Sequence, residues 1–380
     1  MSTDSRSAFA ARPGFVADPT GVAAHYGNPL SEQRGLEAGR SIVELGDRGV
    51  VTVTGPDRLS WLNSLTSQSL DHLAPGVSTE TLLLDPSGRL EQAARVLDDG
   101  ETTWLLVDAA EAPVLSAWLD RMRFMLRVEV ADRSADFATV GSFAPNGAAE
   151  PPVPAVPPVP AAQAGDVPLV WIDPWSTIAE GGVGYADDSV HPAHDWTYRE
   201  ALVAPADLEA LAASEVPVAG VLALEALRIA AWRPRLATEA DERTIPHELD
   251  WLRSAVHLSK GCYRGQETVA KVHNLGHPPR RLVMLHLDGS DNVMPAHGDV
   301  VLDGAGPDAR EVGAITSVGT HHELGPIALA VVKRSTDPTI DLVVRVGESL
   351  IAAGQEVVVP PGAGAAAGVP RLPRLGAVRR

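Results

Sequence analysis

The only cysteine of the 380-residue chain, Cys262, lies in the segment K-G-C-Y-R-G-Q-E at residues 260–267. It lies between two glycines, Gly261 and Gly265, and between two cations, Lys260 and Arg264. Glycines allow sharp turns and let backbone N–H groups approach a ligand closely. Nearby cations favour the thiolate form of cysteine, which is the reactive form. The residues alone therefore fit an activated thiol, and they fit equally well a surface loop with an incidental cysteine.

Other groups nearby could bind a ligand. Tyr263 offers an aromatic face, and Gln266 and Glu267 add an amide and a carboxylate. Three arginines cluster near the end of a predicted upstream helix: Arg228, Arg233 and Arg235. They could complement the dipole of the helix C-terminus. They could also clamp an anion, because guanidinium groups pair with carboxylates through two parallel hydrogen bonds.

Several common catalytic templates are absent from the sequence. We find no G-x-x-x-x-G-K-[ST] and no G-x-G-x-x-G after a strand, so no nucleotide fold is predicted. His273 and His277 are spaced i, i+4 with Cys262 nearby, but a second cysteine and the usual zinc spacing are lacking, so we expect no metal site. A Cys/His nucleophile pair stays open, because spatial neighbours are invisible in sequence. One cysteine also cannot hold an iron–sulfur cluster alone, since such clusters usually take four thiolates.

The segment 260–267 resembles the signature K-G-C-[FY]-x-G-Q-E of the YgfZ family. These proteins are the folate-binding relatives of the glycine-cleavage T-protein that serve iron–sulfur proteins. All seven specified positions match. Residues 227–235 and 245–248 are similar to the family's L-R-I-x-x-x-R-P-R and I-P-x-E runs. The resemblance covers about residues 25–360, with loose boundaries.

The resemblance implies an α+β fold, with a GcvT/YgfZ-like N-terminal folate-binding region of mixed sheets and helices and a small C-terminal β-barrel. It implies a tetrahydrofolate-binding protein that supports assembly or repair of iron–sulfur clusters in client enzymes. Its partners would be iron–sulfur client or scaffold proteins. Cys262 would be a redox or partner-contacting thiol, and Lys260 would lower the pKa of that thiol.

A folate site needs a partly apolar slot, hydrogen-bonding groups for the pterin and cations for the glutamate carboxylates. By resemblance, this pocket lies between the two halves of the N-terminal region. The predicted folate-binding residues are Tyr263, Gln266, Glu267, Arg228, Arg235, Gly261 and Gly265.

Two departures from the T-protein bear on catalysis. Where that branch carries its catalytic aspartate, the matching positions here are Glu91 and Gln92. In the T-protein's R-x-E-A-G run, Ala230 replaces the glutamate. Both changes argue against aminomethyl transfer, because a buried carboxylate that binds a ligand is hard to replace with a methyl group. A folate-dependent aminomethyltransferase or other one-carbon transferase remains the alternative, and a folate-binding regulatory module without thiol chemistry is a third hypothesis.

Composition limits the partners and the compartment. The chain has 49 acidic and 31 basic residues, a formal net charge of -18, which disfavours nucleic acid and anionic membrane surfaces as partners. Apolar residues make up 45%, enough for real cores. A single cysteine fits a reducing compartment. Without a long apolar run to serve as a signal or membrane span, we expect a soluble, cytoplasmic protein.

Pattern and punctuation predict the elements that position these groups. We expect strands at 51–54, 81–84, 90–97, 103–107, 281–287, 299–303, 311–320, 327–333 and 341–346. We expect helices after Asp57 and Asp108 and at 196–213 and 217–232. The predicted regions are a mobile tail at 1–25, a folate-binding region at 26–277, a barrel at 278–360 and a disordered tail at 361–380. The proline-dense segment 142–165 is interpreted as a loop inserted within the folate-binding region.

Overall fold

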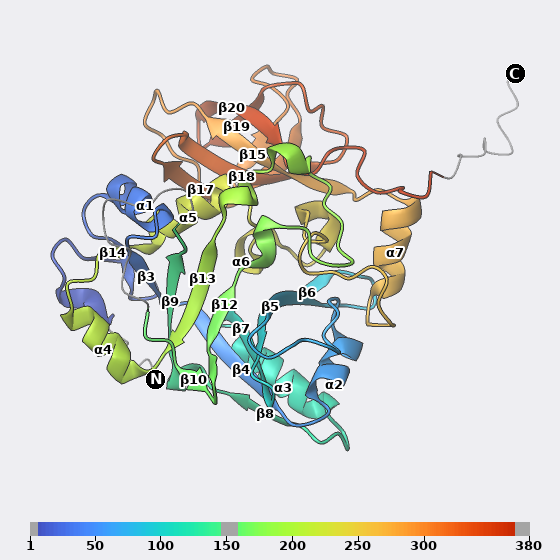
Figure 1. Cartoon of the computed structure of the whole chain (residues 1–380). Helices are drawn as coiled ribbons and strands as arrows, with labels where there is room; N and C mark the ends of the chain where they lie inside the picture. Colours follow the sequence, from blue (N-terminus) through green and yellow to red (C-terminus); the bar gives the residue numbers. More distant parts are fainter. Residues whose placement is uncertain (1–6, 146–158, 369–380) are drawn as a thin grey trace, which may run out of the picture.

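The computed structural model describes residues 7–145 and 159–368. Two five-stranded sheets pack together in the N-terminal part, and a closed six-stranded barrel lies against them (Figure 1). This is the predicted α+β architecture of mixed sheets and helices followed by a small barrel. Among the described helices, none has the length and apolar character needed to cross a membrane.

The first sheet is antiparallel throughout and has the order β5-β6-β7-β4-β8. Its strands are β4 (Arg48–Thr54), β5 (Ser78–Leu84), β6 (Leu90–Asp98), β7 (Thr102–Asp108) and β8 (Glu129–Asp132). Helices α2 (Arg58–Leu65) and α3 (Ala112–Met122) cover its outer face. Along β7, Leu105 and Val107 face these helices, whereas Trp104 and Leu106 face the second sheet. The alternation follows from the two-residue period of a strand.

The second sheet has the order β12-β13-β9-β3-β14 and includes one parallel pair, β14 with β3. Its strands are β3 (Ile42–Leu45), β9 (Ala138–Phe143), β12 (Val170–Ile172), β13 (Tyr198–Val203) and β14 (Val218–Ala219). The helix predicted at 196–213 is therefore wrong in its first half. Residues 198–203 pair with both β9 and β12, and α4 (Pro205–Ala213) begins only afterwards, with proline at its first position.

The remaining helices cover the sheets or lead into the barrel. They are α1 (Pro29–Glu37), α5 (Val221–Ala230), α6 (Leu236–Glu239) and α7 (Gln266–Leu275). The helix predicted at 217–232 begins later than expected, because Val218 belongs to β14. Its residue Leu222 is 49% exposed, and the buried face carries Ala223, Leu227 and Ile229.

The barrel closes in the order β15-β18-β17-β16-β19-β20. Its strands are β15 (Arg280–Leu287), β16 (Val300–Leu302), β17 (Glu311–His321), β18 (Gly325–Lys333), β19 (Leu342–Val346) and β20 (Ser349–Val357). Sequence reasoning missed β20, which completes the barrel by pairing with β15 and β19. Strand β18 is buried on both faces. Its Ala328 and Ala330 point into the barrel, and its Ile327 and Leu329 join the core shared with the sheets.

Short elements complete the chain. They are the strands β1 (Val16–Ala17), β2 (Ala23–His25), β10 (Gln163–Ala164) and β11 (Val167–Pro168), and the 3-10 helices η1 (Ala8–Ala11), η2 (Ser134–Asp136), η3 (Pro174–Ser176), η4 (Asp188–Val190), η5 (Pro192–Asp195) and η6 (Pro246–Leu249). Most of the proline-dense segment lies outside the described residues. Its flanking strands β9 and β12 belong to one sheet.

Both predicted tails are partly wrong. Residues 7–25 form η1, β1 and β2, and Phe9 is buried against Ile42 and Val203 of the second sheet. At the other end, the backbone N–H groups of Ala366 and Ala367 donate to carbonyls near the end of α7. Residues 361–368 therefore belong to the fold, while 1–6 and 369–380 lie outside the described residues.

We expect Phe9→Ala to lower the free energy of unfolding by about 3 kcal/mol, because it empties a fully buried aromatic position. Thermal and chemical unfolding of the purified protein would measure the loss. Val16→Ala is the matched control: Val16 is in the same segment but 46% exposed, so its truncation should cost little. Equal, small effects of both changes would mean that residues 7–25 do not contribute to stability.

Candidate functional site

A partly enclosed cavity lies between the inner faces of the two N-terminal sheets and beside α5. Its walls carry seven carboxylates and five guanidinium groups. The carboxylates are Asp47, Glu80, Asp108, Glu111, Asp173, Glu200 and Glu225; the arginines are Arg48, Arg95, Arg228, Arg233 and Arg235. Several are among the most buried charged side chains of the described chain. Aromatic side chains complete the wall: Trp196, Tyr198 and Trp251.

The charged residues reach the cavity because they share the inward-facing positions of their strands. On β13, Glu200 lies between Tyr198 and Leu202, and both of these belong to the core between the sheets. On β6, Arg95 has the same parity as the core residue Leu97. A strand sends alternate side chains to one face, so each such charge is directed inward with its apolar neighbours.

Glu200 is fully buried and receives several donors on one oxygen. Its Oε1 accepts from Arg48 Nε at 3.0 Å and from Tyr198 Oη at 3.1 Å, and Arg95 Nε lies 3.5 Å away. Burial alone would raise the pKa of Glu200, but Arg48 and Arg95 outweigh burial and hold the pKa below its ordinary value. The other oxygen, Oε2, has no hydrogen-bond partner among the described residues. An ionised carboxylate oxygen is thus left free to accept a ligand donor.

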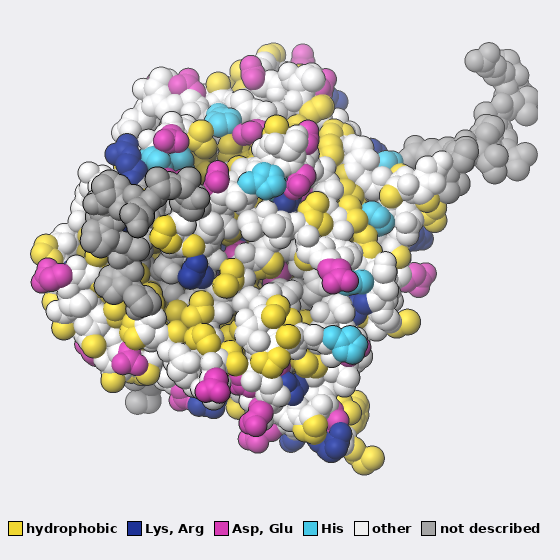
Figure 2. All heavy atoms as spheres, in the orientation of Figure 1, with side chains coloured by type: hydrophobic (Ala, Val, Ile, Leu, Met, Phe, Trp, Pro, Cys, Tyr) yellow, Lys and Arg dark blue, Asp and Glu magenta, His cyan; other side chains and the backbone are white. Residues whose placement is uncertain are grey.

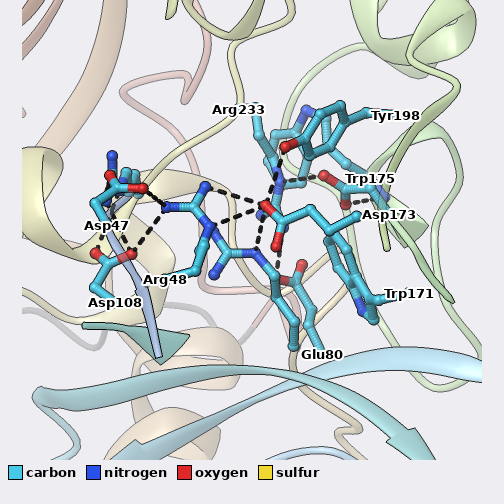
Figure 3. A network of polar contacts seen from close by, with 12 residues as sticks. Asp47, Arg48, Glu80, Asp108, Trp171, Asp173, Trp175, Tyr198 and Arg233 are labelled. Carbon is cyan, nitrogen blue, oxygen red and sulfur yellow. Dashed lines mark hydrogen bonds and ion pairs between the residues drawn. The ribbon is translucent and has the colours of Figure 1, made fainter. Parts of the chain in front are cut away.

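Arg233 pairs with two other buried carboxylates of the cavity wall (Figure 3). Its Nη2 donates to Glu80 at 2.7 Å and its Nε to Asp173 at 3.0 Å, and the guanidinium lies 5.1 Å from the centre of the Trp175 ring. Trp251 Nε1 also donates to Glu80, at 3.2 Å. Arg233 Nη1 and Glu80 Oε1 have no partner within the described part of the chain. A donor and an acceptor therefore remain available on this wall.

The two arginines predicted to bind folate line the same cavity, but both are already paired. Arg228 uses all five N–H groups, on Glu225, Glu239, Ser317 and the carbonyl of Arg233. Its predicted role as an anion clamp does not fit these contacts. Arg235 is partly exposed and pairs with Asp47 and Asp108. The donor–acceptor distances are 2.5 Å to Asp47 and 3.0 and 3.2 Å to Asp108.

The motif at 260–267 lies elsewhere, in the loop after η6 and the first two residues of α7, and none of its residues lines the cavity. Lys260 Nζ donates to three backbone carbonyls at the end of α2, those of Asn63, Thr66 and Gln68, at 2.6 to 2.7 Å. Burial lowers the pKa of Lys260 to about 8. The ammonium group thus ties the loop to α2, and its predicted role in activating Cys262 is not supported by these contacts.

The rest of the motif docks onto the turn between β5 and β6. Arg264 pairs with Glu91 at 2.5 Å. Gly265 has a φ of +83° at the start of α7, and a Cβ atom there would lie 2.6 Å from the carbonyl oxygen of Asp85. Only glycine meets both requirements without strain. The structure therefore places the motif against the turn at 85–89 and the start of β6.

The remaining predicted ligands differ in exposure. Tyr263 is buried in the core, and the centre of its ring lies 5.3 Å from Lys260 Nζ. Burial raises the pKa of its hydroxyl group. Gln266 donates to the carbonyl of Lys260 at 3.3 Å. Three residues are exposed: Gly261, Cys262 and Glu267. The loop thus presents its thiol to solvent rather than to the cavity.

The positions matched to the T-protein aspartate do not line the cavity either. Glu91 is partly exposed and held by Arg264. Gln92 donates to Glu111 and lines a small apolar pocket under α2 and α3. The histidines considered as metal ligands have other contacts, His273 with Tyr185 and His277 with the carbonyl of Ala363. Within residues 7–145 and 159–368, no three His, Cys, Asp or Glu side chains are grouped to hold a metal.

Sequence reasoning missed most of the cavity, including Arg48, Glu80, Asp173 and Glu200. The signal was present: a charged residue at an apolar, inward-facing position of a strand, as in Y-R-E-A-L-V at 198–203. Burying a charge is costly unless it is paired, so such a residue implies a partner on the facing element. We missed it at Glu200 because we assigned that segment to a helix.

No protein-family model matches the chain. The solved structure of the glycine cleavage aminomethyltransferase T from Bartonella henselae shares its fold, with a TM-score of 0.69 and 16% identity over 93% of this chain and 95% of that one. The chain thus has the fold of an aminomethyltransferase T.

Proteins with similar sequences include a transferase, an aminomethyltransferase and an iron–sulfur cluster assembly factor. A chloroplast protein of Arabidopsis thaliana named as a transferase is 23% identical over 350 residues, 89% of this chain and 75% of the relative. A Nostoc aminomethyltransferase is 26% identical over 315 residues, 79% of each protein. The mitochondrial iron–sulfur cluster assembly factor IBA57 homolog of Mycosarcoma maydis is 26% identical over 261 residues, 64% of this chain and 56% of the relative.

The tRNA-modifying protein YgfZ of Aliivibrio fischeri is 30% identical over 105 residues, which is 27% of this chain and 32% of that protein. Together with the IBA57 homolog and the shared fold, this similarity confirms the resemblance to YgfZ proteins that the motif predicted.

We expect Gly265→Ala to destabilise the protein by at least about 2 kcal/mol, because alanine would be strained at positive φ and would press on the β5–β6 turn. Urea unfolding would measure the loss. Gly261→Ala is the matched control in the same loop: its added Cβ would meet no atom within 4 Å. If both variants unfold alike, the motif is not docked as described.

Proposed function

We propose that the protein binds tetrahydrofolate in the cavity between its sheets and supports assembly or repair of iron–sulfur clusters in client enzymes. The fold of an aminomethyltransferase T and the similarity to a cluster assembly factor and to YgfZ support this assignment. The observation that carries the folate half is the free oxygen of the buried, ionised Glu200.

The cavity suits the ring of a reduced pterin. One edge of a pterin carries an amino group and a ring N–H, which are donors that a carboxylate oxygen accepts well. Glu200 Oε2 would receive them, and Glu80 Oε1 and Arg233 Nη1 offer a further acceptor and donor. Trp196 and Tyr198 supply apolar surface for the ring faces. When bound, tetrahydrofolate supplies nitrogen atoms that carry one-carbon groups.

The thiol would act outside this cavity. Cys262 is exposed, and none of its motif neighbours lines the cavity. Folate and thiol therefore serve separate roles in the proposal: folate binding in the cavity, and contact with an iron–sulfur client or scaffold protein through Cys262. Lys260 and Gly265 position the loop that carries the thiol.

Aminomethyl transfer is the second candidate, and the fold and the Nostoc relative favour it. The residues at the expected catalytic position argue against it, because neither Glu91 nor Gln92 lines the cavity. Steady formation of methylenetetrahydrofolate from an aminomethylated lipoyl protein would establish the transferase and displace our proposal.

We expect Glu200→Gln to weaken tetrahydrofolate binding about tenfold or more, because an acceptor oxygen on a charged group is lost. Titration calorimetry on the purified protein would measure it, with thermal unfolding to confirm that the variant is folded. Glu267→Gln is the matched control, an exposed glutamate of the motif. Weaker binding in the control and unchanged binding in Glu200→Gln would place folate at the motif instead.

We expect Cys262→Ser to lower the activity of an endogenous [4Fe–4S] dehydratase in cells whose own copy of this gene is deleted, while the protein stays folded and binds folate. Ser259→Ala, an exposed neighbour in the same loop, is the control. Full activity with Cys262→Ser would remove the thiol from the proposed function without affecting the folate half.

A further inference from the structure

Each of the five arginines that line the cavity has a protein carboxylate within 3.5 Å. Arg48 and Arg95 share Glu200, as described above. Arg233 is held by Glu80 and Asp173, while Arg228 and Arg235 each contact two carboxylates. A new carboxylate from a ligand would therefore approach guanidinium groups that already lie beside a protein carboxylate.

Carboxylates are also in excess. Seven of them line the cavity against five arginines, and Arg228 has a further buried partner in Glu239. The lining therefore carries a formal excess of two negative charges. The formal net charge of -18 on the whole chain has the same sign.

Exposure shows which lining side chains are reached by solvent. The side chains of Glu200 and Glu80 are 0% and 4% exposed, so they lie deep in the cavity. Asp47 and Glu225 are 30% and 28% exposed, against 20% for Arg235. Glu111 is also partly exposed, and its carboxylate accepts a hydrogen bond from the neutral amide of Gln92. These more exposed lining side chains, which we call the rim, are thus mainly acidic.

This arrangement fixes which end of a folate suits which part of the cavity. The free polar atoms, Glu200 Oε2, Glu80 Oε1 and Arg233 Nη1, lie on deeply buried side chains, where a pterin ring can use them. The glutamate end, which carries only carboxylates, is left at the acidic rim. Each further γ-linked glutamate adds one negative charge there.

We propose that the cavity selects folates with a single glutamate over those with a polyglutamate chain, an inference that rests on the proposed folate site. Two like charges about 10 Å apart in water repel weakly, and salt screens them over about the same distance. Summed over the rim, the repulsion corresponds to about a twofold loss of affinity per added glutamate at low salt.

Titration calorimetry of the full chain with tetrahydrofolate monoglutamate and triglutamate tests this selection. At about 20 mM salt, the triglutamate should bind about fourfold more weakly, and the difference should vanish near 0.5 M salt as the charges are screened. Equal or tighter binding of the triglutamate, or a triglutamate affinity that falls as salt rises, would overturn the selection.

Two variants assign the effect to the rim. Glu111→Gln should reduce the difference between the two ligands by about half, because it removes a rim charge and keeps an acceptor for Gln92. Asp308→Asn, on an exposed barrel loop, removes one charge far from the lining residues and should leave the difference unchanged. An equal effect of both variants would mean that net charge, not the rim, discriminates.

The outcomes separate this inference from the proposed function. If both ligands bind with equal affinity, the folate site stands and the selection is wrong. If neither ligand binds to the folded protein, the folate site and the selection fall together.

Discussion

The pairing of buried charges constrains this structure more than any other interaction. Removing an ion from water costs several kcal/mol unless a partner and further hydrogen bonds compensate. Here the partners come from different elements: Arg48 of β4 meets Glu200 of β13, and Arg233 after α5 meets Glu80 of β5. The two sheets can therefore pack in only one register, and the same pairs leave a polar cavity where an apolar core would otherwise form.

The barrel takes part in the same network. Arg228 of α5 and Glu239 of α6 both contact Ser317 of β17, next to an irregularity in the pairing of that strand with β18. One cavity wall is thus held from behind by the barrel, while Leu329 of β18 adds to the shared core. A change in the barrel at Ser317 would alter the cavity wall through Arg228, although no barrel residue lines the cavity.

Sequence reasoning reached the fold class through the resemblance of the motif at 260–267 to a known family, and it found most strands from local periodicity. It failed where distant residues decide. Residues 198–203 precede a run of helix formers, and only pairing with β9 and β12 makes them a strand. Strand β20 is rich in alanine and is fixed by closure of the barrel. Phe9 is held by a surface built from Ile42 and Val203. Lys260 was predicted to act on the thiol, but its partners are backbone carbonyls that no sequence pattern marks.

The solitary, exposed thiol has a consequence for how the protein recovers from oxidation. If Cys262 is oxidised to a sulfenic acid, the chain contains no second cysteine to resolve it as an internal disulfide. Recovery must come from a thiol of another molecule, through a mixed disulfide. The oxidation state of Cys262 would then follow the supply of reducing thiols around the protein, so that one residue reports on the same conditions that damage iron–sulfur clusters.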